Sequence, residues 1–222
     1  MPRGVFITLE GGEGVGKSTQ VRHIVARLAA AGIRSIATRE PGGSPVAELL
    51  RAVLLDGGVK RLGSMAEAIL FAAARIDHIE RLIAPALAAG TFVVCDRFAD
   101  STRAYQGAAG GLDLDFLDGL ERLSLSGLTP DLTLILDLPA ATGLARAARR
   151  RDPGSTADRF ESETIGFHNA LRRAFLAIAA TEPERCVVIN AAANEEAVAA
   201  AVWQAISRRL GDRLSGEAMH GA

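Results

Sequence analysis

The chain has 222 residues, of which 49% are hydrophobic and 23% are charged. This composition can bury a sizeable core, which excludes disorder throughout the chain. Its 25 basic and 26 acidic residues nearly cancel. The balance argues against a polybasic nucleic-acid binder and against a membrane-surface protein, but it leaves room for a small basic pocket.

Alternating strand and helix patterns predict an α/β fold. Short apolar segments rich in β-branched residues predict strands that are buried on both faces, over residues 5–9, 33–38, 91–95, 132–136 and 186–189. Helical patterns cover residues 17–31, 45–55, 64–89, 113–124, 140–149, 162–180 and 194–210. Such alternation implies βαβ units, and therefore a five-stranded parallel sheet flanked by helices.

Three finer expectations concern boundaries and compartment. Ser64 and Glu67 have the spacing of a capping box at the start of the long third helix. We expect one domain over residues 1–212 and a frayed tail over 213–222. Two cysteines, Cys95 and Cys186, cannot form a disulfide framework, and residues 1–10 lack the features of a signal peptide. We therefore expect a cytoplasmic protein.

The first predicted strand runs directly into a phosphate-binding motif. Residues 10–19 read EGGEGVGKST, which is G-x-x-x-x-G-K-[ST] placed between a strand and a helix start. Backbone N–H groups of such a loop point at phosphate oxygens, and the positive end of the helix adds to their field. The predicted ATP-binding residues are Gly11, Gly12, Glu13, Gly14, Val15, Gly16, Lys17, Ser18 and Thr19.

Two of these residues have individual roles in the motif. Lys17, one of only two lysines in the chain, can reach the β- and γ-phosphates, and the Ser18 hydroxyl can ligate Mg²⁺. A GTPase would normally carry an N-K-x-D motif, but neither lysine follows an asparagine. A motor-type ATPase would usually be larger. A small nucleotide kinase needs a second site that binds a phosphate acceptor.

Residues that suit an acceptor site follow the second and third strands. Arg39 and the pair Asp96-Arg97 end strands at the edge where parallel sheets bind ligands. Phe71 and Arg75 lie at i and i+4 on one helix face. A ring and a guanidinium placed like this suit a nucleobase, although such a pair alone is more often core plus a surface charge.

These motifs, in this order, closely resemble the thymidylate kinase family. The matching segments are EGGEGVGKST, TREPGG, FAAAR, the DR pair, STRAYQG, and PDLTLILDL before an arginine-rich stretch, over residues 5 to about 161. The resemblance implies a P-loop NTPase fold with a lid at about 148–160. It also implies transfer of the γ-phosphoryl group of ATP to thymidine 5′-monophosphate (dTMP) with Mg²⁺, in the pathway to dTTP for DNA synthesis.

The resemblance further implies roles in binding the acceptor base and sugar. Phe71 stacks on the thymine and Arg75 hydrogen-bonds its edge, with Thr102 and Gln106 nearby. Tyr105, the only tyrosine in the chain, crowds the 2′ position so that deoxyribose is preferred.

The same comparison implies roles around the phosphates. Arg39 and Arg97 hold the acceptor phosphate, and Glu13 faces the acceptor sugar and phosphate. Asp96 helps to organise the Mg²⁺ shell with Ser18. Arginine suits these positions because its planar fork binds phosphate bidentately and stays charged. The expected catalytic residues are Glu13, Lys17, Arg97 and Arg150.

The catalytic arginine of the family comes from the P-loop or from the lid. Gly14 occupies the position where the P-loop variant carries it, so the lid variety is expected. Spacing does not choose among Arg149, Arg150 and Arg151, and we favour Arg150.

The family also implies a homodimer formed by helix packing, for which the alanine-rich residues 66–74 would permit close approach. The four histidines have no ligand spacing, so no structural metal is expected. Two alternatives stay open. One is a nucleoside kinase that uses Glu13 as a base, and the other is a P-loop regulatory protein that hydrolyses nucleotide slowly.

Overall fold

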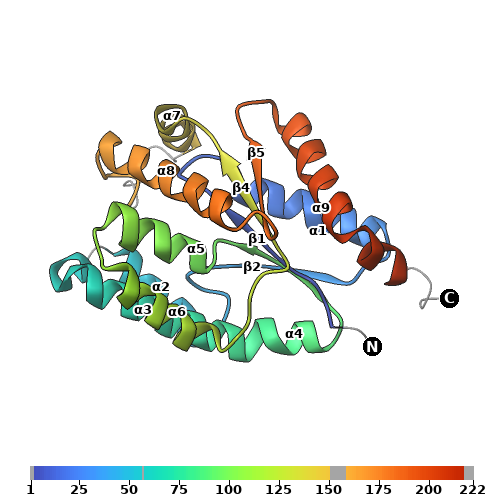
Figure 1. The fold of residues 1–222 in the computed structure, drawn as a ribbon, viewed down its shortest axis with the longest axis horizontal. Helices are drawn as coiled ribbons and strands as arrows, with labels where there is room; N and C mark the ends of the chain where they lie inside the picture. The colour runs from blue at the N-terminus through green and yellow to red at the C-terminus, as the bar shows by residue number, and fades with distance from the viewer. Residues whose placement is uncertain (1–2, 57, 151–158, 218–222) are drawn as a thin grey trace.

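A computed structural model describes residues 3–56, 58–150 and 159–217. Its core is a five-stranded parallel sheet in the order β2-β3-β1-β4-β5 (Figure 1). The strands are β1 (Phe6–Glu10), β2 (Ser35–Arg39), β3 (Phe92–Asp96), β4 (Leu132–Asp137) and β5 (Cys186–Asn190). The predicted α/β fold and five-stranded sheet are confirmed, and each predicted strand lies within two residues of an observed one.

Helices cover both faces of the sheet. They are α1 (Lys17–Ala30), α2 (Pro45–Leu55), α3 (Gly63–His78), α4 (Ala84–Ala88), α5 (Ala99–Thr102), α6 (Leu114–Leu125), α7 (Ala140–Arg150), α8 (Ile165–Thr181) and α9 (Glu195–Glu217). A 3₁₀ turn (Gly58–Leu62) precedes α3, and π-helical turns (Ile79–Ile83 and Arg103–Ala109) follow α3 and α5. In the parts of the chain that the structure describes, no helix is long and apolar enough to cross a membrane.

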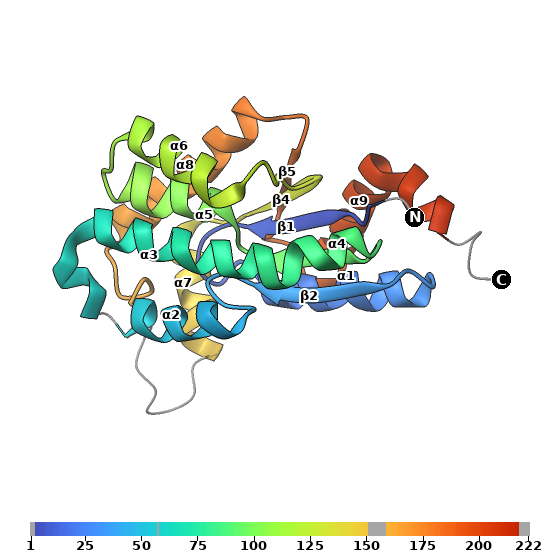
Figure 2. The ribbon, with the colours of Figure 1, turned by 90° about the horizontal axis from the view of Figure 1, so that it is seen from below.

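Alternate residues of the buried strands pack against different helices. Ile7 and Leu9 of β1 face the side covered by α1 and α9, which lie side by side. Phe6 of β1 faces the opposite side, where α4 covers β3 and α8 covers β4 and β5 (Figures 1 and 2). β1 therefore sits at the centre of the sheet, between β3 and β4. The loop that leaves its carboxyl end lies at the crevice where open α/β sheets bind ligands.

Two boundary predictions were wrong. Ser64 and Glu67 do not form a capping box, because α3 already begins at Gly63 and its N-terminus has no side-chain cap. Glu67 is instead buried and pairs with Arg159. The last helix does not end near residue 210. It continues to Glu217, because Leu214 packs against the core.

One helical segment was not predicted. Residues 99–109 form α5 and the π-helical turn that follows it. Their polar residues and glycine give no helical period in the sequence. Tertiary packing decides here: Ala104 and Tyr105 are buried in the same cluster as Leu171 and Phe175 of α8.

Candidate active site

The phosphate-binding loop curls because its glycines adopt backbone angles that other residues avoid. Gly11, Gly14 and Gly16 have φ values of 135°, 68° and 97°. A Cβ added at Gly14 would lie 1.9 Å from the carbonyl oxygen of Gly143 in α7. The loop is therefore packed against α7, and this packing leaves no room for a side chain at position 14.

Lys17 and Ser18 begin α1 directly after this loop. Lys17 is buried, and its Nζ donates to the carbonyl oxygens of Gly11 at 3.0 Å and Gly12 at 2.9 Å. Burial lowers the pKa of Lys17 to about 8, so the side chain is still mostly protonated at neutral pH. The Ser18 Oγ donates to Oδ2 of Asp96 at 2.6 Å. A cation and two oxygen ligands thus meet at the start of α1.

A cavity of about 300 Å³ extends from this loop between β2, α3 and the segment after β3. It brings together most of the residues that the sequence analysis selected, from six separate segments. Its lining includes Glu13, Gly14, Val15, Gly16, Lys17, Ser18, Arg39, Phe71, Arg75, Asp96, Arg97, Thr102, Tyr105, Gln106 and Arg150. Gly11, Gly12 and Thr19 do not line it. The two glycines border a smaller cavity behind the loop, and the Thr19 hydroxyl accepts from Arg22.

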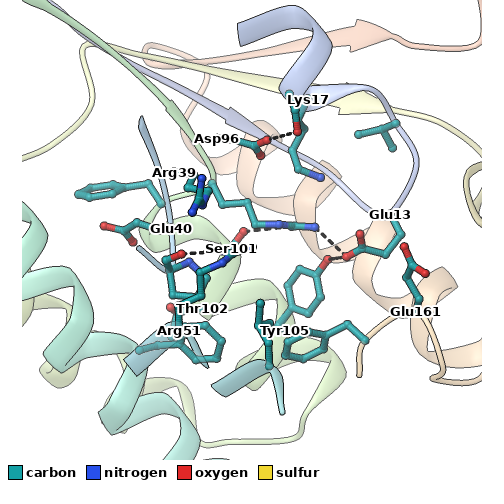
Figure 3. A pocket seen from close by; sticks show the side chains of 18 of the residues that line it. Glu13, Lys17, Arg39, Glu40, Arg51, Asp96, Ser101, Thr102, Tyr105 and Glu161 are labelled. Atoms are coloured by element: carbon teal, nitrogen blue, oxygen red, sulfur yellow. Dashed lines mark hydrogen bonds and ion pairs between the residues drawn. The ribbon is translucent and has the colours of Figure 1, made fainter. Parts of the chain in front are cut away.

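Arg97 connects the phosphate loop to the middle of the cavity. Its Nη2 donates to Oε1 of Glu13 at 2.7 Å and its Nη1 to the carbonyl oxygen of Gly11 at 3.1 Å. The Tyr105 hydroxyl donates to the same Glu13 oxygen at 2.6 Å, and Figure 3 shows Glu13 and Tyr105 pointing toward one another. The guanidinium also lies 5.0 Å from the Tyr105 ring centroid. These contacts fix the orientation of all three side chains.

The same contacts set the ionisation of Glu13. Burial alone would raise the pKa of Glu13, but the positive charges of Arg97 and Lys17 and the Tyr105 hydrogen bond outweigh it and lower the pKa to about 2. Glu13 is therefore an anion at any physiological pH, and it holds cations in place.

Arg75 marks the far end of the cavity. Its Nε donates to Oε2 of Glu40 at 2.8 Å, and its Nη2 donates to the Thr102 hydroxyl at 2.9 Å. Arg75 is only 3% exposed and Glu40 6%. The second Glu40 oxygen is hydrogen-bonded to Nδ1 of His78 at 3.1 Å. The arginine is thus held rigidly, and its position does not depend on a ligand.

Aromatic rings line the wall beside Arg75. Phe71 is half-buried at the cavity, and its ring centroid lies 6.5 Å from that of Phe160. Phe160 in turn packs edge-on against Tyr105, with centroids 4.9 Å apart. A flat group between Phe71 and Arg75 would meet a ring on its face and donors at its edge. Phe71 and Arg75 thus both line the cavity, whereas their binding of a nucleobase stays a prediction.

Two of these residues, Glu40 and Phe160, were missed by the sequence analysis. Glu40 lies inside the TREPGG motif, next to the selected Arg39, so the motif itself was the available signal. Phe160 follows the arginine-rich stretch and carries no comparable signal. Its contact with Tyr105 joins segments that are distant in the sequence.

The remaining arginines differ in where they lie. Arg39 is half-exposed, and its Nη2 donates to Glu48 at 3.0 and 3.1 Å. Arg150, at the end of α7, lines the cavity, whereas Arg149 does not. Arg146 points elsewhere and donates to the carbonyl oxygen of Ala191 at 2.9 Å. Arg151 and most of the expected lid, residues 151–158, lie outside the described residues.

This fold and site define a P-loop nucleotide kinase, in which one cavity extends from the phosphate loop to Phe71 and Arg75. Comparison with known proteins gives the family. The model of the family described as thymidylate kinase matches residues 9–202. The chain belongs to the thymidylate kinase family.

Individual relatives cover nearly the whole chain. A thymidylate kinase of Rhodopseudomonas palustris is 58% identical over 209 residues, which are 94% of this chain and 90% of that protein. One from a Bradyrhizobium species is 56% identical over 208 residues, covering 94% and 92%. The crystal structure of thymidylate kinase from Ehrlichia chaffeensis superposes with a TM-score of 0.75 at 31% identity, covering 92% of this chain and 100% of that one.

The low pKa of Glu13 predicts an acid-dependent contribution to stability. An unfolded glutamate titrates near pH 4.5, so the stabilising effect of Glu13 should be complete above that pH and lost as pH falls toward 2. The shift corresponds to a contribution on the order of 3 kcal/mol. We expect the free energy of unfolding of the wild type to exceed that of Glu13→Gln at pH 7, and the gap to close between pH 5 and 2. A gap that stays constant over this range would contradict the assignment.

Proposed function

We propose that this protein phosphorylates dTMP to thymidine 5′-diphosphate with ATP as the phosphoryl donor, in the pathway to dTTP. One observation carries the proposal: a single cavity holds both the phosphate loop at Lys17 and the pair formed by Phe71 and Arg75. A P-loop regulatory protein that binds and hydrolyses one nucleotide does not need a second pocket for a nucleobase. The family membership supports the same substrate.

In this proposal the chemistry is mostly positioning and charge neutralisation. Two phosphate groups that repel one another must be brought together, and little covalent work is left to the protein. Lys17 and the loop amides bind the donor phosphates, and Arg97 and Arg39 hold the acceptor phosphate. Arg150 reaches the transferred group, where a well-placed arginine is worth roughly 10³–10⁵ in rate.

The acceptor nucleoside would lie further along the cavity. Phe71 covers the face of the thymine, and Arg75, held by Glu40, donates to its edge together with Thr102 and Gln106. Tyr105, whose hydroxyl is bonded to Glu13, would lie beside the sugar and crowd its 2′ position. Deoxyribose is therefore preferred.

Mg²⁺ would be held by Ser18 and Asp96, partly through water. Their oxygens lie 2.6 Å apart beside the phosphate loop, and Mg²⁺ prefers oxygen ligands. Among the described residues no group of three or more histidine, cysteine or acidic side chains could hold a metal. Such a sparse protein site is what Mg²⁺ uses when phosphates and water complete its shell. When bound, the ion neutralises charge on the donor phosphates.

The ionisation of Glu13 argues against a nucleoside kinase. A nucleoside acceptor needs a general base, and an effective base has a pKa near the working pH. The pKa of Glu13 is about 2, so this carboxylate is a poor proton acceptor. A monophosphate acceptor is already ionised and needs no such base.

The test is an ADP-release assay with ATP and Mg²⁺, comparing dTMP, deoxyuridine monophosphate, thymidine and no acceptor. We expect turnover only with the monophosphates, and the highest turnover with dTMP, because Arg97 and Arg39 need a phosphate to bind. Turnover with thymidine would indicate a nucleoside kinase. ADP release that is independent of acceptor would leave the phosphate loop but contradict a kinase.

Replacing Arg150 tests the lid arginine. We expect Arg150→Ala to lower kcat by roughly 10³ while the KM for dTMP changes little, because the side chain acts on the transferred phosphoryl group. Arg146→Ala is the matched control, since Arg146 lies on the same helix but binds backbone carbonyls at Ala191 and Ala192. Equal kcat values in the two variants would contradict the role of Arg150.

We also propose that the protein is a homodimer through α2 and α3. Apolar side chains form an exposed stripe on α3 at Met65, Ile69 and Ile76, beside exposed Leu49 and Val53 of α2. The two helices lie against one another on the outside of the molecule (Figure 2). Of the alanines in residues 66–74, Ala68, Ala72 and Ala74 are buried within the protomer. Ala73 is exposed, four residues after Ile69 on the stripe, where it would permit close approach of the partner helix.

Ile69→Glu tests this interface. The side chain is 47% exposed in the protomer, so the substitution should preserve the fold but place a charge in the apolar contact. We expect the wild type to sediment as a dimer at micromolar concentration and Ile69→Glu as a monomer. Ile165→Glu on α8, which is 50% exposed, is the control and should stay dimeric. A monomeric wild type would refute the proposal.

The cellular setting that fits this reaction is the cytoplasm. Cys95 and Cys186 are both free and buried, which suits a reducing compartment.

A further inference from the structure

Glu10 is a buried carboxyl group that none of the proposed steps uses. It is the last residue of β1, is 0% exposed, and lies directly before the phosphate loop. Its Oε1 accepts the backbone N–H of Phe98 at 2.7 Å, and its Oε2 accepts the Ser101 hydroxyl at 2.6 Å. Both carboxyl oxygens therefore act on one short segment, which comprises the turn after β3 and the start of α5.

Arg97 lies within this turn and has an unfavourable backbone conformation. Its φ is 70°, in the left-handed region that residues with a side chain rarely adopt. Surrounding contacts must hold it there. The Arg97 N–H donates to the carbonyl oxygen of Leu9 at 2.9 Å, and the Cys95 thiol donates to the Arg97 carbonyl at 3.0 Å. Glu10 fixes the residues that follow.

The backbone and the guanidinium of Arg97 are thus anchored to two successive residues at the carboxyl end of β1, Glu10 and Gly11. Glu10 holds the backbone after Arg97 through Phe98, while the Gly11 carbonyl accepts from the guanidinium at 3.1 Å. Ser101 contacts both Glu10 and Arg97, because its hydroxyl donates to Glu10 and lies 3.4 Å from Nη1 of Arg97. Both the backbone after Arg97 and its guanidinium are therefore held beside the cavity.

We propose that Glu10 is a positioning residue that keeps Arg97 in the left-handed conformation in which its guanidinium faces the acceptor phosphate. The inference rests on the proposed role of Arg97 in holding that phosphate. Glu10 itself touches neither substrate. It acts on the acceptor side of the reaction through Arg97, although it borders the loop that binds the donor.

The environment of Glu10 fits a specific role. Burial raises the pKa of Glu10 to about 8, and the nearby Asp100 adds to the effect. Burying a carboxyl group carries a desolvation penalty, which an apolar residue at the same position in the strand would not have. An apolar side chain could not accept from the Phe98 amide and the Ser101 hydroxyl, so the turn would lose both anchors.

A double-mutant cycle tests the inference, with the variants Glu10→Ala, Arg97→Ala and the two combined. We expect Glu10→Ala to lower kcat/KM for dTMP by about tenfold or more, with the KM for ATP within about twofold of wild type. In the Arg97→Ala background, removing Glu10 should cost less than about twofold, because its target is already gone. An equal loss in both backgrounds would overturn the proposal.

Two variants separate positioning from a general loss of stability. Thr8→Val is the matched control: Thr8 lies two residues earlier on the same face of β1, is 0% exposed, and bonds to Thr133 at 2.8 Å, away from Arg97. It should lower the Tm without raising the KM for dTMP. Glu10→Gln should restore most of kcat/KM, since its amide can accept from Phe98 and donate to Ser101. A rise in KM that follows the loss of Tm in all variants would contradict the role.

If Glu10→Ala does not fold, Glu10→Met replaces it in the cycle, because a methionine fills a similar volume but cannot accept from the Phe98 amide and the Ser101 hydroxyl. Calorimetric titration of dTMP gives a second readout, and its dissociation constant should follow the same pattern. Failure of the wild type to use dTMP would contradict both the proposed function and this inference. An active wild type in which the effects of the two substitutions are additive would contradict only the inference.

Discussion

The structure depends on holding several cationic side chains around one cavity before any phosphate arrives. Lys17, Arg39, Arg75, Arg97 and Arg150 all line it. Like charges in a partly enclosed space repel one another, so most of them are paired within the protein. Arg97 is neutralised by Glu13, Arg75 by Glu40 and Arg39 by Glu48, while Lys17 donates to loop carbonyls. This arrangement explains how a chain with a net charge of −1 can present a site for two anions.

One of these pairs also fixes the position of Arg97 relative to the phosphate loop. Glu13 belongs to the phosphate loop after β1, and Arg97 follows β3. Their ion pair therefore joins the carboxyl ends of two neighbouring strands. On the other side of the loop, the close approach of Gly14 to Gly143 fixes α7. Arg150 lies at the end of that helix and lines the cavity. The phosphate loop therefore positions both Arg97 and Arg150 relative to the cavity.

The sequence located the residues that line the cavity better than the residues that support them. The phosphate loop, Arg97, and the pair of Phe71 and Arg75 could be selected because local spacing determines their geometry. Glu40 supports Arg75 from 35 residues away, and Phe160 reaches Tyr105 across an even longer separation. No periodicity records such contacts. For Glu67 the local spacing was misleading. It predicted a helix cap, but in the structure Glu67 pairs with Arg159 instead.

Apart from the helical segment 99–109, the sequence by itself determined how strands and helices alternate along the chain. It also determined the position of the phosphate loop and the side chains available at the carboxyl ends of β2 and β3. These depend on hydrophobic periodicity and on short motifs, which act over a few residues. Only the tertiary structure decided which acid neutralises which arginine, that Arg150 lines the cavity while Arg146 turns away, and that Arg97 is held in a left-handed conformation. Those outcomes depend on groups brought together by packing of the sheet and its helices, and therefore on distances that no local pattern specifies.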